Sequence, residues 1–139
     1  MKLDTSTKFG ARVLERLQQE QVIWLTTVRP DGIPQPNPVW FLWDGETILI
    51  YSQPGAHKVG HIRHNPHVAL NFNTDAGGDD VVVITGEARI DDIAAQAVEN
   101  TAYLEKYRAG IAQIGMTPES MAAAYSTMIR VTPRHVRGF

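Results

Sequence analysis

The residues SQPGAHKVGHIRHNP, at positions 52–66, form the densest group of chemically active side chains in the sequence. His57, His61 and His64 are four and three positions apart, so a helix would place them on one face. Three imidazole nitrogens on one face could hold a zinc ion. No Asp or Glu within this stretch could orient such a ligand or act as a base. We therefore expect no metal site here, and an ordinary solvated face is the simpler interpretation.

Lys58 in the same stretch favours a different chemistry, the binding of an anion. The Pro-Gly pair at 54–55 breaks the preceding strand, and a short helix can run from His57 to Asn65 before Pro66. The first turn of a helix exposes unpaired N–H groups and positive potential, which attract an anion. A lysine in that turn is unfavourable to the helix dipole. The stretch is interpreted either as a phosphate cradle or as a helix whose lysine points into solvent.

Three alternating prolines lie just upstream, at Pro34, Pro36 and Pro38. Alternate residues of a strand direct their N–H groups toward the same neighbour, so these prolines remove donors from one edge only. One interpretation is an edge strand protected against further pairing. The other is a split between strands, where a ligand can lie against the chain. The proline pattern alone does not decide between them.

Hydrophobic patterns predict the elements that position these residues. Apolar residues recur at helical spacing over 8–20, and runs rich in β-branched and aromatic residues alternate with turn residues. The expected strands are 22–28, 35–43, 47–52, 67–73, 81–90 and 127–139, and further helices are expected over 92–108 and from Pro118. Gly86, inside the fifth strand, indicates a bulge. Short turns join the first three strands, so the pattern predicts a small antiparallel barrel with helices outside it.

Composition limits the classes of function. The chain has 139 residues, of which 43% are hydrophobic and 20% charged, and we expect one domain over 1–139. It has no cysteine, so disulfides, thiolate metal ligands and a cysteine nucleophile are excluded. The net charge of −2 gives no general attraction to nucleic acid or membranes. Neither a signal peptide nor a membrane-spanning run is visible, and we expect a cytoplasmic protein that acts on a small molecule.

The segment TTVRPDGIPQPNPVWFLWDGETILIYSQPGAHKVGHIRHNPHVALNF resembles the flavin-binding split-barrel family related to pyridoxamine 5′-phosphate oxidase. Four motifs match in order: the T-x-R-x-D-G-x-P hairpin, P-V-W-F, Y-S-x-x-x-x-K and N-P-x-V-A-L. The later G-E-A-R-I and the terminal I-R-V-T-P-R-H-V-R-G-F also fit, so the resemblance covers about residues 8–139. Within the family, the sequence is most similar to the short deazaflavin-dependent branch, whose members use coenzyme F-420.

The resemblance implies a mainly β fold, a six-stranded antiparallel Greek-key split barrel flanked by short α-helices. It also implies a homodimer with the cofactor groove at the interface. Carried over to this sequence, the phosphate would be bound by Lys58 with Ser52, Tyr51 and His57. The ring would lie along Pro38, Val39 and Trp40, and Phe139 would reach the ring of the other subunit. His57 and Ala56 stand where the oxidases often have arginine and serine, which weakens the case for an ordinary FMN site.

The expected function is that of an oxidoreductase with F-420 as hydride carrier and a small, mainly apolar organic substrate. The alternatives are an FMN-binding flavoprotein similar to pyridoxamine-phosphate oxidase, or a non-catalytic flavin- or haem-binding module. No catalytic residue is evident. A basic rim for the anionic tail of F-420 is expected from these residues: Lys58, His61, Arg63 and His64, with Arg130, Arg134 and Arg137 as candidates from the last strand.

Overall fold

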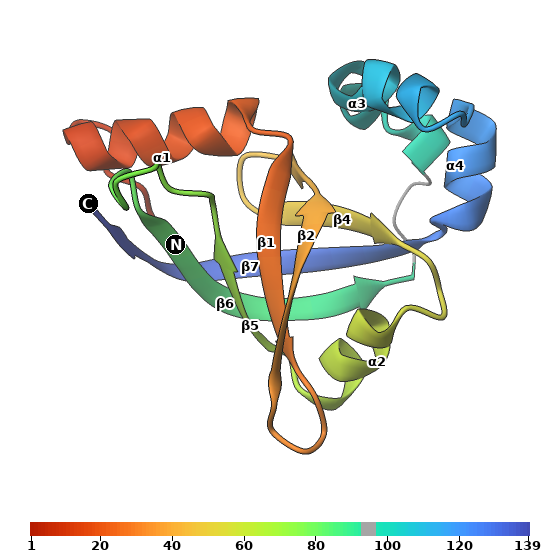
Figure 1. Cartoon of the computed structure of the whole chain (residues 1–139), viewed down its shortest axis with the longest axis horizontal. Coiled ribbons are helices and arrows are strands. Elements are labelled where there is room, and N and C mark those ends of the chain that lie inside the picture. The colour runs from red at the N-terminus through yellow and green to blue at the C-terminus, as the bar shows by residue number, and fades with distance from the viewer. Residues whose placement is uncertain (93–96) are drawn as a thin grey trace.

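The computed structural model describes residues 1–92 and 97–139, which form a curled antiparallel sheet with helices packed around it (Figure 1). The elements in chain order are α1 (Lys8–Gln19), β1 (Val22–Val28), β2 (Pro34–Trp40), β3 (Leu42–Trp43), β4 (Ile48–Ser52), α2 (His57–His64), β5 (His67–Asn71), β6 (Val82–Asp91), the 3-10 helix η1 (Ala97–Glu99), α3 (Thr101–Gln113), α4 (Pro118–Ala124) and β7 (Thr127–Gly138).

The sheet has seven strands in the order β2-β1-β5-β6-β7-β4-β3, and every neighbouring pair is antiparallel. Its two edge strands, β2 and β3, are separated in the chain by Phe41 alone. The sheet must therefore curl until its two edges nearly meet, which makes an incomplete barrel. β2 and β4 approach each other across this opening without pairing. The structure thus agrees with the expected split barrel.

The strand count differs from the expected six, because the predicted strand 35–43 is divided in two. Phe41 interrupts it, since the backbone N–H and C=O of Phe41 bond to the hydroxyl of Tyr107 instead of to a neighbouring strand. A side chain from a distant helix makes this break, so the local sequence could not show it. The other predicted strands are found within two residues of their expected ends.

Helix boundaries follow capping side chains. The hydroxyl of Thr7 accepts from the N–H of Gly10 at the start of α1, and the side chain of Asn100 accepts from Tyr103 at the start of α3. The helix predicted over 92–108 therefore starts later, at Thr101, and extends to Gln113. Part of that prediction, residues 93–96, lies outside the described residues.

The two longest strands, β6 and β7, carry the bulge that Gly86 predicts. Their register shifts between Thr85 and Gly86. A Cβ atom on Gly86 would lie 2.2 Å from the backbone oxygen of Thr132, so the close approach of the two strands requires glycine. The bend helps to curl the sheet around its interior.

The apolar side chains form two clusters. The first fills the interior of the curled sheet and includes Leu25, Phe41 and Ile129. The second lies between β4, β7 and residues 97–124, a segment between β6 and β7 that we call the helical insertion. Figure 1 shows this insertion at the end of the sheet opposite the chain termini. Over the described ranges, no helix has the length and apolar character needed to cross a membrane.

Candidate functional site

A cavity of about 310 Å³, called here the main cavity, lies where the open edge of the sheet meets α2 and the helical insertion. Its lining combines aromatic, aliphatic and polar side chains from five elements and their ends. These residues are Pro38, Val39 and Trp40 of β2, Tyr51 and Ser52 of β4, Lys58 of α2, Tyr103 of α3, and Ile114, Met121 and Tyr125 from the end of α3 through α4.

The alternating prolines form the open edge of the sheet beside this cavity. β2 pairs with β1 over seven residues and has no partner on its other side. Because that ladder is regular, the N–H positions that proline removes must face the unpaired side. Both sequence interpretations are therefore combined: β2 is a proline-protected edge strand, and Pro38 also lines the opening between β2 and β4.

Lys58 is the one cationic side chain among the residues that line the main cavity. It is half-buried, and burial lowers the pKa of its ammonium group below the usual value. No hydrogen bond or ion pair joins this group to any residue in 1–92 or 97–139. The helix that carries it, α2, also begins without a side-chain cap, since Ala56 occupies the N-cap. An unpaired ammonium beside uncapped N–H groups is suited to bind an anion.

Ser52 and Tyr51 at the end of β4 are both buried. The Ser52 hydroxyl donates to the backbone oxygen of Gln53 at 3.1 Å. While this bond is kept, the hydroxyl can only accept a hydrogen bond from a ligand; to donate to a ligand it must first break the bond to Gln53. The amide of Asn100 donates to the Tyr51 hydroxyl at 3.2 Å, and burial raises the pKa of this phenol. Tyr51 is therefore a neutral, fixed wall residue near neutral pH.

Trp40 adds an aromatic ring to the lining of the main cavity. Its indole stacks on the ring of Tyr107 with centroids 4.7 Å apart and planes 9° from parallel. The Tyr107 hydroxyl accepts from Phe41 N–H at 2.8 Å and lies 2.6 Å from the carbonyl oxygens of Gln21 and Phe41, to one of which it donates. Gly110 lies behind the indole, where a Cβ atom would come within 3.1 Å of it. Trp40 is thus held flat against α3.

A second cavity, of about 340 Å³, adjoins the main one and shares Lys58 with it. We call it the polar cavity, since its other lining residues are Arg29, Gln35, Asn37, His57 and His61. The rings of His57 and His61 lie 6.4 Å apart, and Nδ1 of His61 is 2.9 Å from the hydroxyl of Thr27. Lys58 therefore stands between an aromatic compartment and one with several hydrogen-bond donors.

Six of the eight site residues predicted from the sequence line the main cavity: Pro38, Val39, Trp40, Tyr51, Ser52 and Lys58. His57 lies in the polar cavity instead. Phe139 lines neither; it is 69% exposed at the other end of the sheet, where its backbone pairs with Val81. Any contact of Phe139 with a ligand would have to be made across a dimer interface, as the resemblance implies.

Four lining residues were not predicted: Tyr103, Ile114, Met121 and Tyr125. The first three belong to the helical insertion and Tyr125 follows it directly; all four are 45 or more positions from Lys58 in the sequence. Tyr103 and Met121 are each part of an apolar series at helical spacing, and such a series indicates core packing rather than a cavity. Both residues do pack in the second apolar cluster as well.

The basic rim expected from the last strand is not formed as predicted. Arg130 bonds to the carboxylates of Asp91 and Asp44, at 2.8 and 3.2 Å. Arg134 pairs with Glu87 at 3.0 Å on a different surface. These carboxylates are far from the arginines in sequence, so local charge counting could not foresee the pairing. Within residues 1–92 and 97–139, no group of three or more His, Asp or Glu side chains is placed to hold a metal ion.

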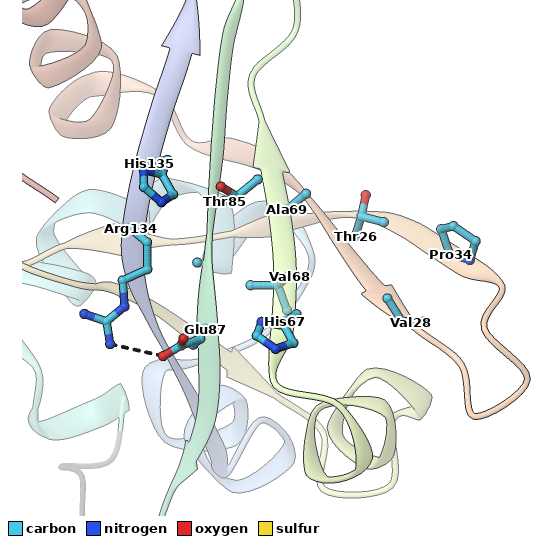
Figure 2. A pocket seen from close by; sticks show the side chains of 11 residues that line it. Thr26, Val28, Pro34, His67, Val68, Ala69, Thr85, Glu87, Arg134 and His135 are labelled. Carbon is cyan, nitrogen blue, oxygen red and sulfur yellow. Dashed lines mark hydrogen bonds and ion pairs between the residues drawn. The ribbon is translucent and has the colours of Figure 1, made fainter.

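A separate, shallow hollow of about 510 Å³ lies on the outer face of the sheet (Figure 2). Small side chains of three adjacent strands, Thr26, Ala69 and Thr85, line its floor. The ion pair between Arg134 and Glu87 lies at its side (Figure 2). Apart from Arg134, which was a candidate for the expected basic rim, it contains none of the predicted site residues.

Comparison with known proteins relates this arrangement to a family. Residues 9–139 match the family model described as pyridoxamine 5′-phosphate oxidase. General stress protein 26 of Bacillus subtilis is 33% identical over 85 residues, which is 60% of this chain and 60% of that protein, so the match spans less than two thirds of the relative.

Two solved structures are similar over most of their length. A candidate pyridoxamine 5′-phosphate oxidase from Listeria innocua is 27% identical, with a TM-score of 0.66, and the match covers 91% of this chain and 94% of that one. An F-420 reductase is 25% identical, with a TM-score of 0.67, over 88% of this chain and 94% of that one.

Proposed function

Because this chain belongs to the pyridoxamine 5′-phosphate oxidase family, we propose that it is an oxidoreductase with the deazaflavin coenzyme F-420 as its hydride carrier. The substrate would be a small, mainly apolar organic molecule. The observation that carries this proposal is the position of Lys58, an unpaired, half-buried ammonium group shared by an aromatic cavity and a polar one. We also propose that the protein acts in the cytoplasm.

The two cavities fit the two halves of such a cofactor. Trp40, held flat by Tyr107, and the neighbouring Val39 would contact the apolar ring system. Lys58 would hold the phosphate, assisted by the N–H groups at the start of α2. When bound, a deazaflavin supplies a hydride for transfer to the substrate. The chain's own part is to orient the ring, neutralise the phosphate and exclude water from the main cavity.

The polar cavity favours F-420 over FMN. FMN ends at its phosphate, whereas F-420 continues beyond the phosphate into an anionic glutamate tail. Beyond Lys58, the polar cavity offers the amides of Gln35 and Asn37 and the imidazoles of His57 and His61. These groups can donate hydrogen bonds to carboxylates, whereas FMN has no group beyond its phosphate that could accept them.

A titration of cofactor-free protein tests the proposal. F-420, FMN, haem and the F-420 chromophore without phosphate or tail would each be added, with binding followed by fluorescence or absorbance. We expect F-420 to bind more tightly than FMN, and the tail-free chromophore to bind most weakly of the three flavins. Tighter binding of FMN would assign the protein to the oxidase-like side of the family. A preference for haem, or no binding, would refute the proposal.

We further propose that the protein is a homodimer and that the hollow in Figure 2 is part of its interface. The floor of the hollow is built of small, uncharged side chains that a second copy could approach closely. At the side of the hollow, the ion pair of Arg134 and Glu87 offers one positive and one negative group to a second copy related by twofold symmetry. Thr85→Arg would place a charge in the floor, and we expect it to give a monomer in light-scattering chromatography. Thr5→Arg, at an exposed position of the amino-terminal segment, is the matched control.

A further inference from the structure

Lys106 is a half-buried lysine of α3 that has no part in the cofactor contacts proposed above. Its Nζ donates to the backbone oxygen of Phe41 at 2.8 Å. We infer that Lys106 is a positioning residue, which holds the chain at Phe41 so that the neighbouring Trp40 presents its ring to the main cavity. This inference rests on the proposed function, since Trp40 is expected to contact the cofactor ring.

Two aromatic rings and one carbonyl group fix the place of the Lys106 ammonium group. Nζ lies 3.8 Å from the centroid of the Phe41 ring and 5.3 Å from that of the Tyr107 ring, and both rings are buried. Such cation–π contacts attract an ammonium group. Among the described residues no carboxylate forms an ion pair with Lys106, and Glu20, which favours its charged form, is bonded to Arg16 instead. Lys106 therefore interacts with Phe41 rather than with an acidic partner.

The count of donors and acceptors around Phe41 shows what Lys106 contributes. The Tyr107 hydroxyl has one hydrogen to donate, yet it lies 2.6 Å from two carbonyl oxygens, those of Gln21 and Phe41. Lys106 gives the Phe41 carbonyl a second donor, so the hydroxyl hydrogen is left for Gln21. Without Lys106 the two carbonyls would compete for a single hydrogen, and a buried carbonyl without a donor is costly.

Phe41 transmits this arrangement to Trp40, because it alone separates β2 from β3. Its N–H donates to the Tyr107 hydroxyl at 2.8 Å, so α3 binds both polar groups of this backbone unit. The Trp40 ring stacks on Tyr107 with centroids 4.7 Å apart, and Gly110, one helical turn beyond Lys106, leaves room for it. One face of α3 thus sets both the course of the chain at Phe41 and the place of the ring.

The position of Lys106 predicts an effect on the ring of the cofactor and not on its phosphate. Lys106 is absent from the lining of the main and polar cavities, whereas Lys58 belongs to both. A change at Lys106 should therefore weaken the binding of F-420 and of its chromophore without phosphate or tail by the same factor. A change at Lys58 should weaken F-420 far more than this tail-free chromophore.

Fluorine NMR of the protein labelled with 5-fluorotryptophan tests the inference without any cofactor. The chain has three tryptophans, and the Trp40 signal is assigned by its loss in Trp40→Phe. We expect Lys106→Met to shift the Trp40 signal, and Lys106→Arg, which keeps a donor, to leave it near its original position. Trp24, whose indole donates to Asn73 at 3.0 Å, is the internal reference and should not shift. A general loss of stability would not produce this selective shift.

Titration of the same variants with F-420 and with the tail-free chromophore gives the second readout. Lys106→Met should weaken both about three- to tenfold, because the ring loses a preorganised contact surface, and Lys106→Arg should stay within about twofold of the original affinity. Arg108→Met removes an exposed cation from the same helix and is the matched control. If Lys106→Met does not fold, Lys106→Gln replaces it, since its side chain is one bond too short to keep the contact with Phe41.

Three results would overturn the inference: an unchanged Trp40 signal in Lys106→Met, an equal shift in Arg108→Met, or a loss of F-420 affinity that spares the tail-free chromophore. A Lys106→Arg variant that behaves like Lys106→Met would also contradict it, because the donor would then not be the group that matters. Failure of the original protein to bind F-420 would instead refute the proposed function, since the fluorine NMR test is made on the cofactor-free protein.

Discussion

Replacement of Lys58 by alanine is the sharpest test of the proposed anion site. A hydrogen bond to a charged group contributes about 1.5–3 kcal/mol, which corresponds to about a 10- to 150-fold change in dissociation constant. The ammonium group of Lys58 is already partly desolvated and unpaired in the free protein. Little further dehydration opposes its contact with a phosphate, so we expect the loss of F-420 affinity to lie in the upper half of this range.

The pH dependence of binding should identify the same group. Burial lowers the pKa of Lys58 in the free protein, and a bound phosphate would raise it again by stabilising the charged form. As the pH rises through the lowered pKa, the free protein loses the charge and F-420 should bind less tightly. The Lys58→Ala variant should lack this decline, because the titrating group is absent.

The assay is a fluorescence titration with F-420 over a range of pH above neutrality, with circular dichroism to confirm folding. Arg63 was expected in the basic rim, but it lies at an exposed position outside both cavities. Arg63→Ala is therefore the matched control, since it removes one positive charge from the same helix. If Lys58→Ala binds F-420 within about twofold of the original affinity, or if Arg63→Ala loses as much, the anion site is not at Lys58.

Three further predictions concern the frame around the site. Tyr107→Phe removes the hydroxyl that satisfies the backbone of Phe41, and it should lower the free energy of unfolding by about 1–3 kcal/mol, measured by urea denaturation. Burial lowers the pKa of Lys106 to about 8, so the unfolded chain binds more protons above that pH. Thermal stability should therefore rise from about pH 8 to about pH 9, below the range where the buried tyrosines Tyr51, Tyr103 and Tyr107 ionise in the unfolded chain, and Lys106→Met should flatten this rise. Gly86→Ala forces a methyl group against the backbone oxygen of Thr132 and should cost at least about 1–3 kcal/mol in the same denaturation assay.

Most of the local framework could be predicted from the sequence. Each strand has its own run of β-branched and aromatic residues, and short turns such as Asp31-Gly32 fix which strands pair as hairpins. Pro38 to Lys58 span 21 positions, and the β3–β4 hairpin and the start of α2 within them bring these residues to one edge. The local sequence is therefore sufficient to predict the residues on one side of the main cavity.

The remaining features depend on contacts between distant segments. The hydroxyl of Tyr107 reaches Phe41 across 66 positions and divides a predicted strand in two. Arg130 is paired with Asp44, which is 86 positions away, and is therefore not part of the expected basic rim.

The sequence by itself determined the strands, the proline-protected edge and the basic helix, because turn chemistry and side-chain periodicity act over a few residues. Tertiary structure alone decided which charges are paired and that Ile114, Met121 and Tyr125 complete the cavity. These outcomes are set by how the sheet closes and where the helical insertion packs, which no local pattern encodes.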